Sequence, residues 1–132
     1  YHGTQQINQG QMDRWNIVST LNYLNNDQEI KIILSKIKKL NNKDGKDIVK
    51  CMVATADLSR SGFINGDIST VMSPRTVLTW AENYLLFNDI EYSFKLSFLN
   101  RCDEMERSIL QEYFQRSFGI DITDAKVVNV KE

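Results

Sequence analysis

The tripeptide Ser73-Pro74-Arg75 places a cation at the predicted start of a helix. Serine is a favourable N-cap, and proline suits the first helical position because its missing N–H and its fixed φ do no harm there. Arg75 then falls in the first turn, where the helix dipole favours anions rather than cations. The arginine is therefore either an exposed surface residue or a group that binds phosphate.

Arg14 is the second arginine of interest, because fixed guanidinium groups stabilise the charge that develops on a transferring phosphoryl group. It follows Asp13 in a polar first segment that is rich in glutamine and asparagine. A salt bridge to Asp13 or to another acidic group is the ordinary structural explanation for this arginine. The two tryptophans, Trp15 and Trp80, are predicted to pack in the core.

Other arrangements that could perform chemistry fail one by one. His2 is the single histidine and has no potential metal ligand at a suitable spacing. Gly45-Lys46 lacks the upstream glycine of a phosphate-binding loop. Asp103, Glu104 and Glu106 could be imagined as an acid and a base, but carboxylates at the start of a helix usually cap it. We therefore expect no metal site and no complete active site in this chain.

The composition indicates one compact domain. The chain has 132 residues, of which 42% are hydrophobic, and a formal net charge of −1. This length suffices for a core, and the charge gives no argument for nucleic acid or a membrane surface as partner. No membrane-spanning run or signal peptide is recognisable, so we expect a cytoplasmic protein. Cys51 and Cys102 lie far apart and are predicted to be buried free thiols.

The periodicity of apolar residues predicts a mainly α fold. Asn65-Gly66-Asp67 and Gly119 are predicted to end helices. A helical turn or two is expected at 8–14, the β-branched residues of 16–24 predict a strand, and 127–130 reads as a short strand or packing arm. The expected fold is thus a helical bundle preceded by a short helix and a strand. Its helices are expected at about residues 26–40, 46–64, 74–87, 90–101 and 103–118.

Several segments together resemble a known family. The segment Gln9-Gly10-Gln11-Met12-Asp13-Arg14-Trp15 is similar to the part of AAA+ ATPases, especially of the MoxR-like group, that ends in the arginine finger. Ser73-Pro74-Arg75 resembles the sensor-2 motif that opens a helix of the AAA+ lid. Nearly the whole chain resembles the C-terminal part of the AAA+ subunit of aerobic cobaltochelatases, the CobS type. The segments that carry this resemblance are 3–9, 12–15, 63–67, 69–77, 98–104 and 113–116.

The resemblance implies two parts and two functional arginines. Residues 1–25 would be the C-terminal remnant of the AAA+ α/β core, and residues 26–132 would be the helical lid subdomain with its tail. Arg14 would be a trans arginine finger that reaches the nucleotide of a neighbouring subunit, whereas Arg75 would contact the ATP phosphates of its own subunit. The phosphate-binding loop and the Mg²⁺-binding acidic strand would precede Tyr1. ATP and Mg²⁺ would thus be cofactors of the full-length protein, with none expected in this chain alone.

The implied function is to couple ATP hydrolysis to cobalt insertion into the corrin ring in cobalamin biosynthesis. The partners would be copies of the same subunit in a ring and the CobT-type and CobN-type subunits, and the chain alone should be inactive. Two alternatives stay open, a fragment of a MoxR-type chaperone and a non-enzymatic helical interaction module. The module would equally accommodate the uneven charge, with lysines concentrated in 31–50 and carboxylates in 82–106.

Overall fold

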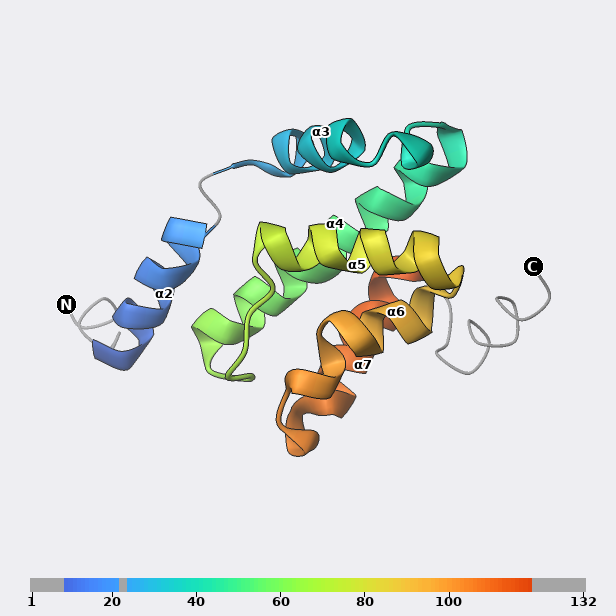
Figure 1. Ribbon diagram of the computed structural model, residues 1–132. Coiled ribbons are helices and arrows are strands. Elements are labelled where there is room, and N and C mark those ends of the chain that lie inside the picture. Colours follow the sequence, from blue (N-terminus) through green and yellow to red (C-terminus); the bar gives the residue numbers. More distant parts are fainter. Residues whose placement is uncertain (1–8, 22–23, 120–132) are drawn as a thin grey trace.

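The computed structural model describes residues 9–21 and 24–119, and this part is 83% helical and contains no strand. The predicted mainly α helical bundle is therefore confirmed. Figure 1 shows the arrangement of its helices. The six α-helices are α2 (Gln9–Leu21), α3 (Asn26–Lys36), α4 (Lys43–Asn65), α5 (Pro74–Phe87), α6 (Ile90–Ser97) and α7 (Arg107–Phe118). Short 3₁₀ turns are η1 (Lys38–Leu40), η2 (Leu99–Arg101) and η3 (Glu104–Glu106).

Helix α4 is the element on which most of the others pack. Helices α2, α3, α5 and α7 all contact it, whereas α6 packs mainly on α5. In Figure 1, α3 lies above α5, the pair α6 and α7 lies below it, and α2 stands at the edge of the molecule. The bundle is thus built from α3 to α7, with α2 added to one side of α4.

The strand predicted over residues 16–24 is wrong for residues 16–21, which belong to α2. The β-branched side chains favoured a strand, but a strand needs neighbours for its backbone hydrogen bonds, whereas a helix satisfies its own. Thr20 fits this helix because its Oγ1 donates a hydrogen bond to the Asn16 carbonyl at 2.9 Å. Residues 22 and 23 lie outside the described residues, as do His2 and the predicted extended segment 127–130.

The ends of the helices follow local sequence signals. Gly66, with φ of 84°, ends α4, and Gly119, with φ of 69°, ends α7, as predicted. The last predicted helix begins later than expected, because Asp103 caps the short turn η3 and α7 starts only at Arg107. Gly66 and Gly119 can adopt this left-handed backbone conformation because they have no Cβ, which would clash in it.

An aromatic cluster joins α5, α6 and α7. Trp80 is fully buried, and its ring centroid lies 4.8 Å from that of Phe94 and 5.8 Å from that of Phe118. Phe114 stacks on Phe94 with centroids 5.2 Å apart. The indole Nε1 of Trp80 donates to the carbonyl of Ile90 at 3.3 Å, so the polar atom of this buried ring is satisfied. The prediction that Trp80 packs in the core is confirmed.

Two other core predictions are corrected by the structure. Trp15 is 53% exposed on α2, so its assignment to the core is wrong. Its helix, α2, makes its main contacts with α4, and Val18 is the residue of α2 that is buried. Cys102 is buried as predicted, whereas Cys51 is only half-buried.

Candidate functional site

Arg75 lies where the sequence places it, in the first turn of α5. Ser73 is the N-cap, and its Oγ accepts a hydrogen bond from the backbone N–H of Thr76 at 3.2 Å. Pro74 occupies the first helical position, and the side chain of Arg75 is exposed. A cation in this position gains nothing from the helix dipole. An anion bound beside Arg75, by contrast, would be attracted both by the guanidinium and by the N-terminus of the helix.

A cavity of about 360 Å³ lies between α3 and the start of α5. Lys36 and Arg75 bring two cations to it, and several aliphatic side chains supply apolar walls. This combination suits a ligand that joins an anionic group to an apolar one, as a nucleotide does. The lining residues are Leu24, Glu29, Ile32, Ile33, Lys36, Pro74, Arg75 and Leu78.

A second cavity, of about 410 Å³, lies on the other side of Arg75, between α5 and the end of α6. Arg101 lines it together with Arg75, and Arg101 Nη2 donates to the carbonyl of Ser97 at 2.7 Å. The remaining lining residues are Ser73, Thr76, Thr79, Leu96 and Ser97. Arg75 therefore borders two cavities, and the cavity on the α3 side has more aliphatic lining residues.

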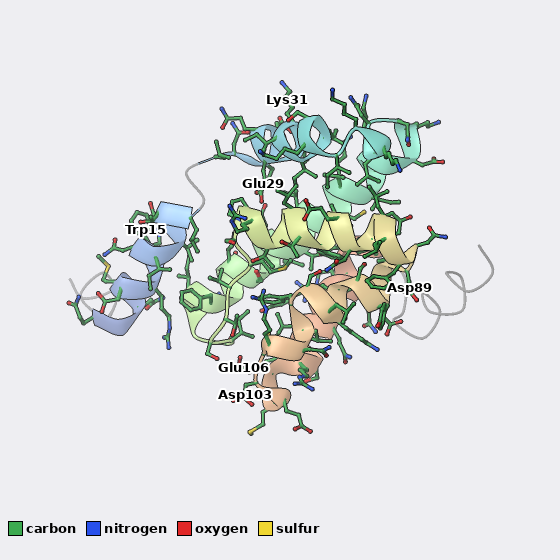
Figure 2. All side chains as sticks on the ribbon, viewed as in Figure 1. Trp15, Glu29, Lys31, Asp89, Asp103 and Glu106 are labelled. Atoms are coloured by element: carbon green, nitrogen blue, oxygen red, sulfur yellow. The ribbon has the colours of Figure 1, made fainter. Side chains whose placement is uncertain are left out.

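The backbone that leads into α5 is held by a buried ion pair that the sequence analysis missed. Arg60 of α4 is 2% exposed and binds the carboxylate of Glu29 with both terminal nitrogens, at 3.0 and 2.9 Å. Its Nε donates to the carbonyl of Met72 at 2.9 Å. Figure 2 shows Glu29 between α3 and α5. Arg60 thus ties α3 to the residue that precedes the Ser73 cap.

A signal for this ion pair was present in the sequence. Arg60 follows Met52 and Ala56 at intervals of four residues, so the sequence places it on the same face of the predicted helix as these apolar residues. A charged residue on a buried stripe needs a partner of opposite charge. Glu29 gives less of a signal, because an acidic residue in the first turn of a helix is common and needs no partner.

The carboxylates near residue 103 have structural roles. Asp103 accepts a hydrogen bond from the backbone N–H of Met105 at 3.0 Å. Glu106 accepts hydrogen bonds from the backbone N–H and the Oγ of Ser69, at 2.9 and 3.1 Å. Both lie at the lower end of the molecule in Figure 2. Asp103 is thus a cap, as expected, whereas the Glu106 side chain makes no cap hydrogen bond and instead binds Ser69. The described residues hold no group of three potential ligands for a metal ion.

Arg14 lies elsewhere, on α2 beside the end of α4. Its side chain is half-buried, and its guanidinium carbon lies 5.9 Å from the centroid of the Phe63 ring. Asp13 accepts a hydrogen bond from Gln9 Nε2 at 2.9 Å. Neither cavity beside Arg75 is lined by Arg14. The structure therefore places the two arginines in separate sites.

Neither cysteine has the environment of an activated nucleophile. Burial is the main cause that raises the pKa of the Cys102 thiol, and burial with the nearby Asp47 carboxylate raises the pKa of Cys51. Cys102 donates its thiol hydrogen to the carbonyl of Phe98, with the sulfur 3.3 Å from the oxygen. Both groups are therefore protonated thiols near neutral pH, and thiolate chemistry is not supported.

The fold is a helical bundle consistent with the C-terminal lid of an AAA+ ATPase. The chain is 57% identical over 124 residues to the aerobic cobaltochelatase subunit CobS of Sinorhizobium sp.. The match covers 94% of this chain and 37% of that relative, of which it is similar to the C-terminal part. The resemblance to CobS-type subunits is thus confirmed.

The other comparisons add no relative. No protein-family model matches the chain, and no solved structure matches it. Among the described residues, the helices are too short or too polar for any of them to cross a membrane.

Proposed function

We propose that this chain is the C-terminal part of the AAA+ ATPase subunit of an aerobic cobaltochelatase. In the full-length protein it would couple ATP hydrolysis to the insertion of cobalt into the corrin ring during cobalamin biosynthesis, in the cytoplasm. The observation that carries the proposal is the 57% identity to a CobS subunit over 94% of the chain. ATP and Mg²⁺ would be bound chiefly by parts of the full-length protein that precede Tyr1.

Arg75 would contact the phosphates of the ATP bound to its own subunit. Its exposure, its place in the first turn of α5 and the adjoining cavity with Lys36 support this role. When phosphate leaves, Arg75 would lose its partner, and the lid would then rotate against the core. This rotation would be passed to the CobT-type and CobN-type subunits.

Arg14 would act in trans, on the nucleotide of the next subunit of a ring. Its guanidinium is steadied by the Phe63 ring but is not fully buried, so it remains available to an approaching surface. Met12 and Trp15 are large apolar side chains three positions apart on the same helix; they are 43% and 53% exposed and line one cavity together with Ile64. Apolar side chains grouped on an exposed helix are typical of a surface that is covered in an assembly.

The experiment is a pair of substitutions in the full-length subunit. Arg14→Ala should lower the rate of ATP hydrolysis by about 10³- to 10⁵-fold, as the loss of an arginine finger does. Arg75→Ala should weaken nucleotide binding as well as turnover. Arg116→Ala, which removes an exposed arginine paired with Glu112, is the control and should change neither. An unaltered rate for Arg14→Ala in an intact ring would contradict its role.

Mixed rings separate the two roles. Subunits with Arg14→Ala, mixed with subunits inactivated in the phosphate-binding loop, should regain part of the hydrolysis, because an intact nucleotide site can then meet a neighbour that carries Arg14. The same mixture with Arg75→Ala should regain none, since no subunit then has a complete site of its own. Recovery in the second mixture would contradict a cis role for Arg75.

Cobalt insertion tests the wider proposal. The full-length subunit, combined with the CobT-type and CobN-type subunits, ATP and Mg²⁺, should insert cobalt into the corrin ring. A MoxR-type chaperone would hydrolyse ATP but would not support this reaction, and a helical interaction module would do neither.

A further inference from the structure

We propose that Arg60 is a positioning residue for Arg75, and that it sets the geometry of the phosphate-sensing arginine through the carbonyl of Met72. This inference rests on the proposed role of Arg75 in nucleotide binding. Arg60 itself is buried and would not touch the nucleotide. Its effect would pass through the short backbone segment that begins with Met72 and ends in the first turn of α5.

The first step is the geometry of the guanidinium. Nη1 and Nη2 of Arg60 bind the two oxygens of Glu29, and Nε binds the Met72 carbonyl. Nη1 also lies 3.1 Å from Asp57 Oδ1. A planar group with donors on two sides can hold α3 and the Met72 backbone at once, whereas a lysine ammonium cannot reproduce this fork.

The second step is the segment that Arg60 holds. Met72 is fully buried, and its backbone N–H donates to Ser59 Oγ at 3.2 Å. Both polar atoms of the Met72 backbone are therefore bound by neighbouring side chains of α4. Ser73, the cap of α5, follows directly, so a shift of Met72 would move the cap and the first turn that contains Arg75.

The third step is electrostatic. Glu29 and Arg75 line the same cavity, in which a phosphate would have to approach Arg75. With Arg60 in place, the charge of Glu29 is neutralised by two short hydrogen bonds. Without them, the carboxylate would repel phosphate and would compete for the Arg75 guanidinium. Arg60 therefore both places Arg75 and neutralises the carboxylate that lines the same cavity.

The energetics favour a role in geometry over a role in stability. A buried ion pair loses its hydration, so apolar residues of similar volume often stabilise a core as well or better. The pair of Arg60 and Glu29 is nevertheless built into a core of this small bundle. The property that an apolar pair could not supply is the directed hydrogen bond from Nε to the Met72 carbonyl.

The test measures binding of a fluorescent ATP analogue and the kcat and KM for ATP in the full-length subunit. Arg60→Lys keeps the charge and removes the fork, and a misplacement of about 1 Å in a binding group can reduce function by up to about 100-fold. We expect about tenfold weaker binding for Arg60→Lys. Arg116→Lys, at the exposed pair with Glu112, is the matched control and should bind normally.

A double-mutant cycle decides whether Arg60 acts through Arg75. The variant with both Arg60→Lys and Arg75→Ala should lose less binding than the sum of the two single losses, because the arginine to be positioned is gone and only the repulsion of phosphate by Glu29 remains. Glu29→Gln, added to Arg60→Lys, should recover part of the binding, since the competing charge is removed. A merely structural role for Arg60 would give additive losses and no such recovery.

The remaining outcomes distinguish a failure of the Arg60 proposal from a failure of the proposed function. Normal binding by a folded Arg60→Lys variant, or additive losses in the cycle, would overturn the positioning role and leave the proposed function intact. Normal binding and turnover by Arg75→Ala would overturn both. If Arg60→Lys does not fold, Ser59→Ala is used in the same cycle, because it removes the hydrogen bond to the Met72 N–H and leaves the Arg60 ion pair intact; the bond from Ser59 Oγ to the Ala56 carbonyl within α4 is also lost. It should weaken binding about threefold, and a normal affinity would overturn the proposal.

Discussion

Helix α2 and the bundle of α3 to α7 bury their apolar side chains in different ways. In the bundle, Trp80 and Phe94 are fully buried by residues of the chain itself. In α2, Val18 is buried, whereas Met12 and Trp15 remain exposed. The bundle therefore has a buried core of its own, although Leu86 and Met105 remain exposed on it, whereas α2 buries only Val18.

The two arginines of the proposed function follow the same division. Arg75 extends from a bundle helix whose entry is held by Arg60 and by the Ser73 cap. Arg14 extends from α2 and rests on Phe63. A residue that contacts the nucleotide of its own subunit must be held in position by that subunit. A residue that acts in trans can instead be positioned by contacts with the neighbouring subunit. The comparison thus favours the cis and trans roles that we propose.

Replacing each tryptophan by alanine is the strongest test of this comparison. Trp80→Ala removes a fully buried ring from the aromatic cluster and should lower the free energy of unfolding by about 3 to 5 kcal/mol. Trp15→Ala removes a ring that is 53% exposed and should change it by about 0.5 kcal/mol or less. Urea unfolding followed by circular dichroism measures both. A large loss for Trp15→Ala would show that α2 belongs to the same cooperative unit as the bundle.

Glycine-to-alanine substitutions should change stability in opposite directions in the two regions. At Gly45, near the start of α4, an added Cβ would lie 2.1 Å from the Leu40 carbonyl oxygen, a backbone atom that cannot move alone. Gly45→Ala should therefore destabilise the chain by about 1 to 3 kcal/mol. Gly10 is exposed within α2, where alanine is favoured by up to about 1 kcal/mol in helix propensity. Thermal unfolding and amide hydrogen exchange of α2 compare the two, and equal destabilisation would contradict the distinction.

Removing the cap of α5 should have the smallest of these effects on the bundle. Ser73→Ala leaves the backbone N–H of Thr76 without its acceptor and should reduce stability by about 1 kcal/mol. Ser73→Thr keeps an acceptor oxygen and is the control. Chemical denaturation of the two variants measures the difference. If Ser73→Ala were as stable as Ser73→Thr, the cap would not be what fixes the start of this helix.

Much of the fold could be predicted because its signals are local. The apolar spacing gave the bundle helices, Ser73 and Pro74 gave the start of α5, and Gly66 and Gly119 gave two helix ends. The predicted strand was wrong over residues 16–21 because β-branched propensity is weak evidence when no neighbouring strand is known. The division at residue 25 and the roles of Arg14 and Arg75 stay predictions.

The sequence by itself determined which arginines to examine and which helix carries Arg75, because caps and helix periodicity depend on residues a few positions apart. Only the tertiary structure decided what holds that helix in place. Glu29 and Arg60 are 31 residues apart, and their ion pair forms because the packing of α3 on α4 excludes water from both groups at once. The tertiary structure likewise left Trp15 exposed and buried Trp80, since burial depends on which helices surround a side chain and not on its type.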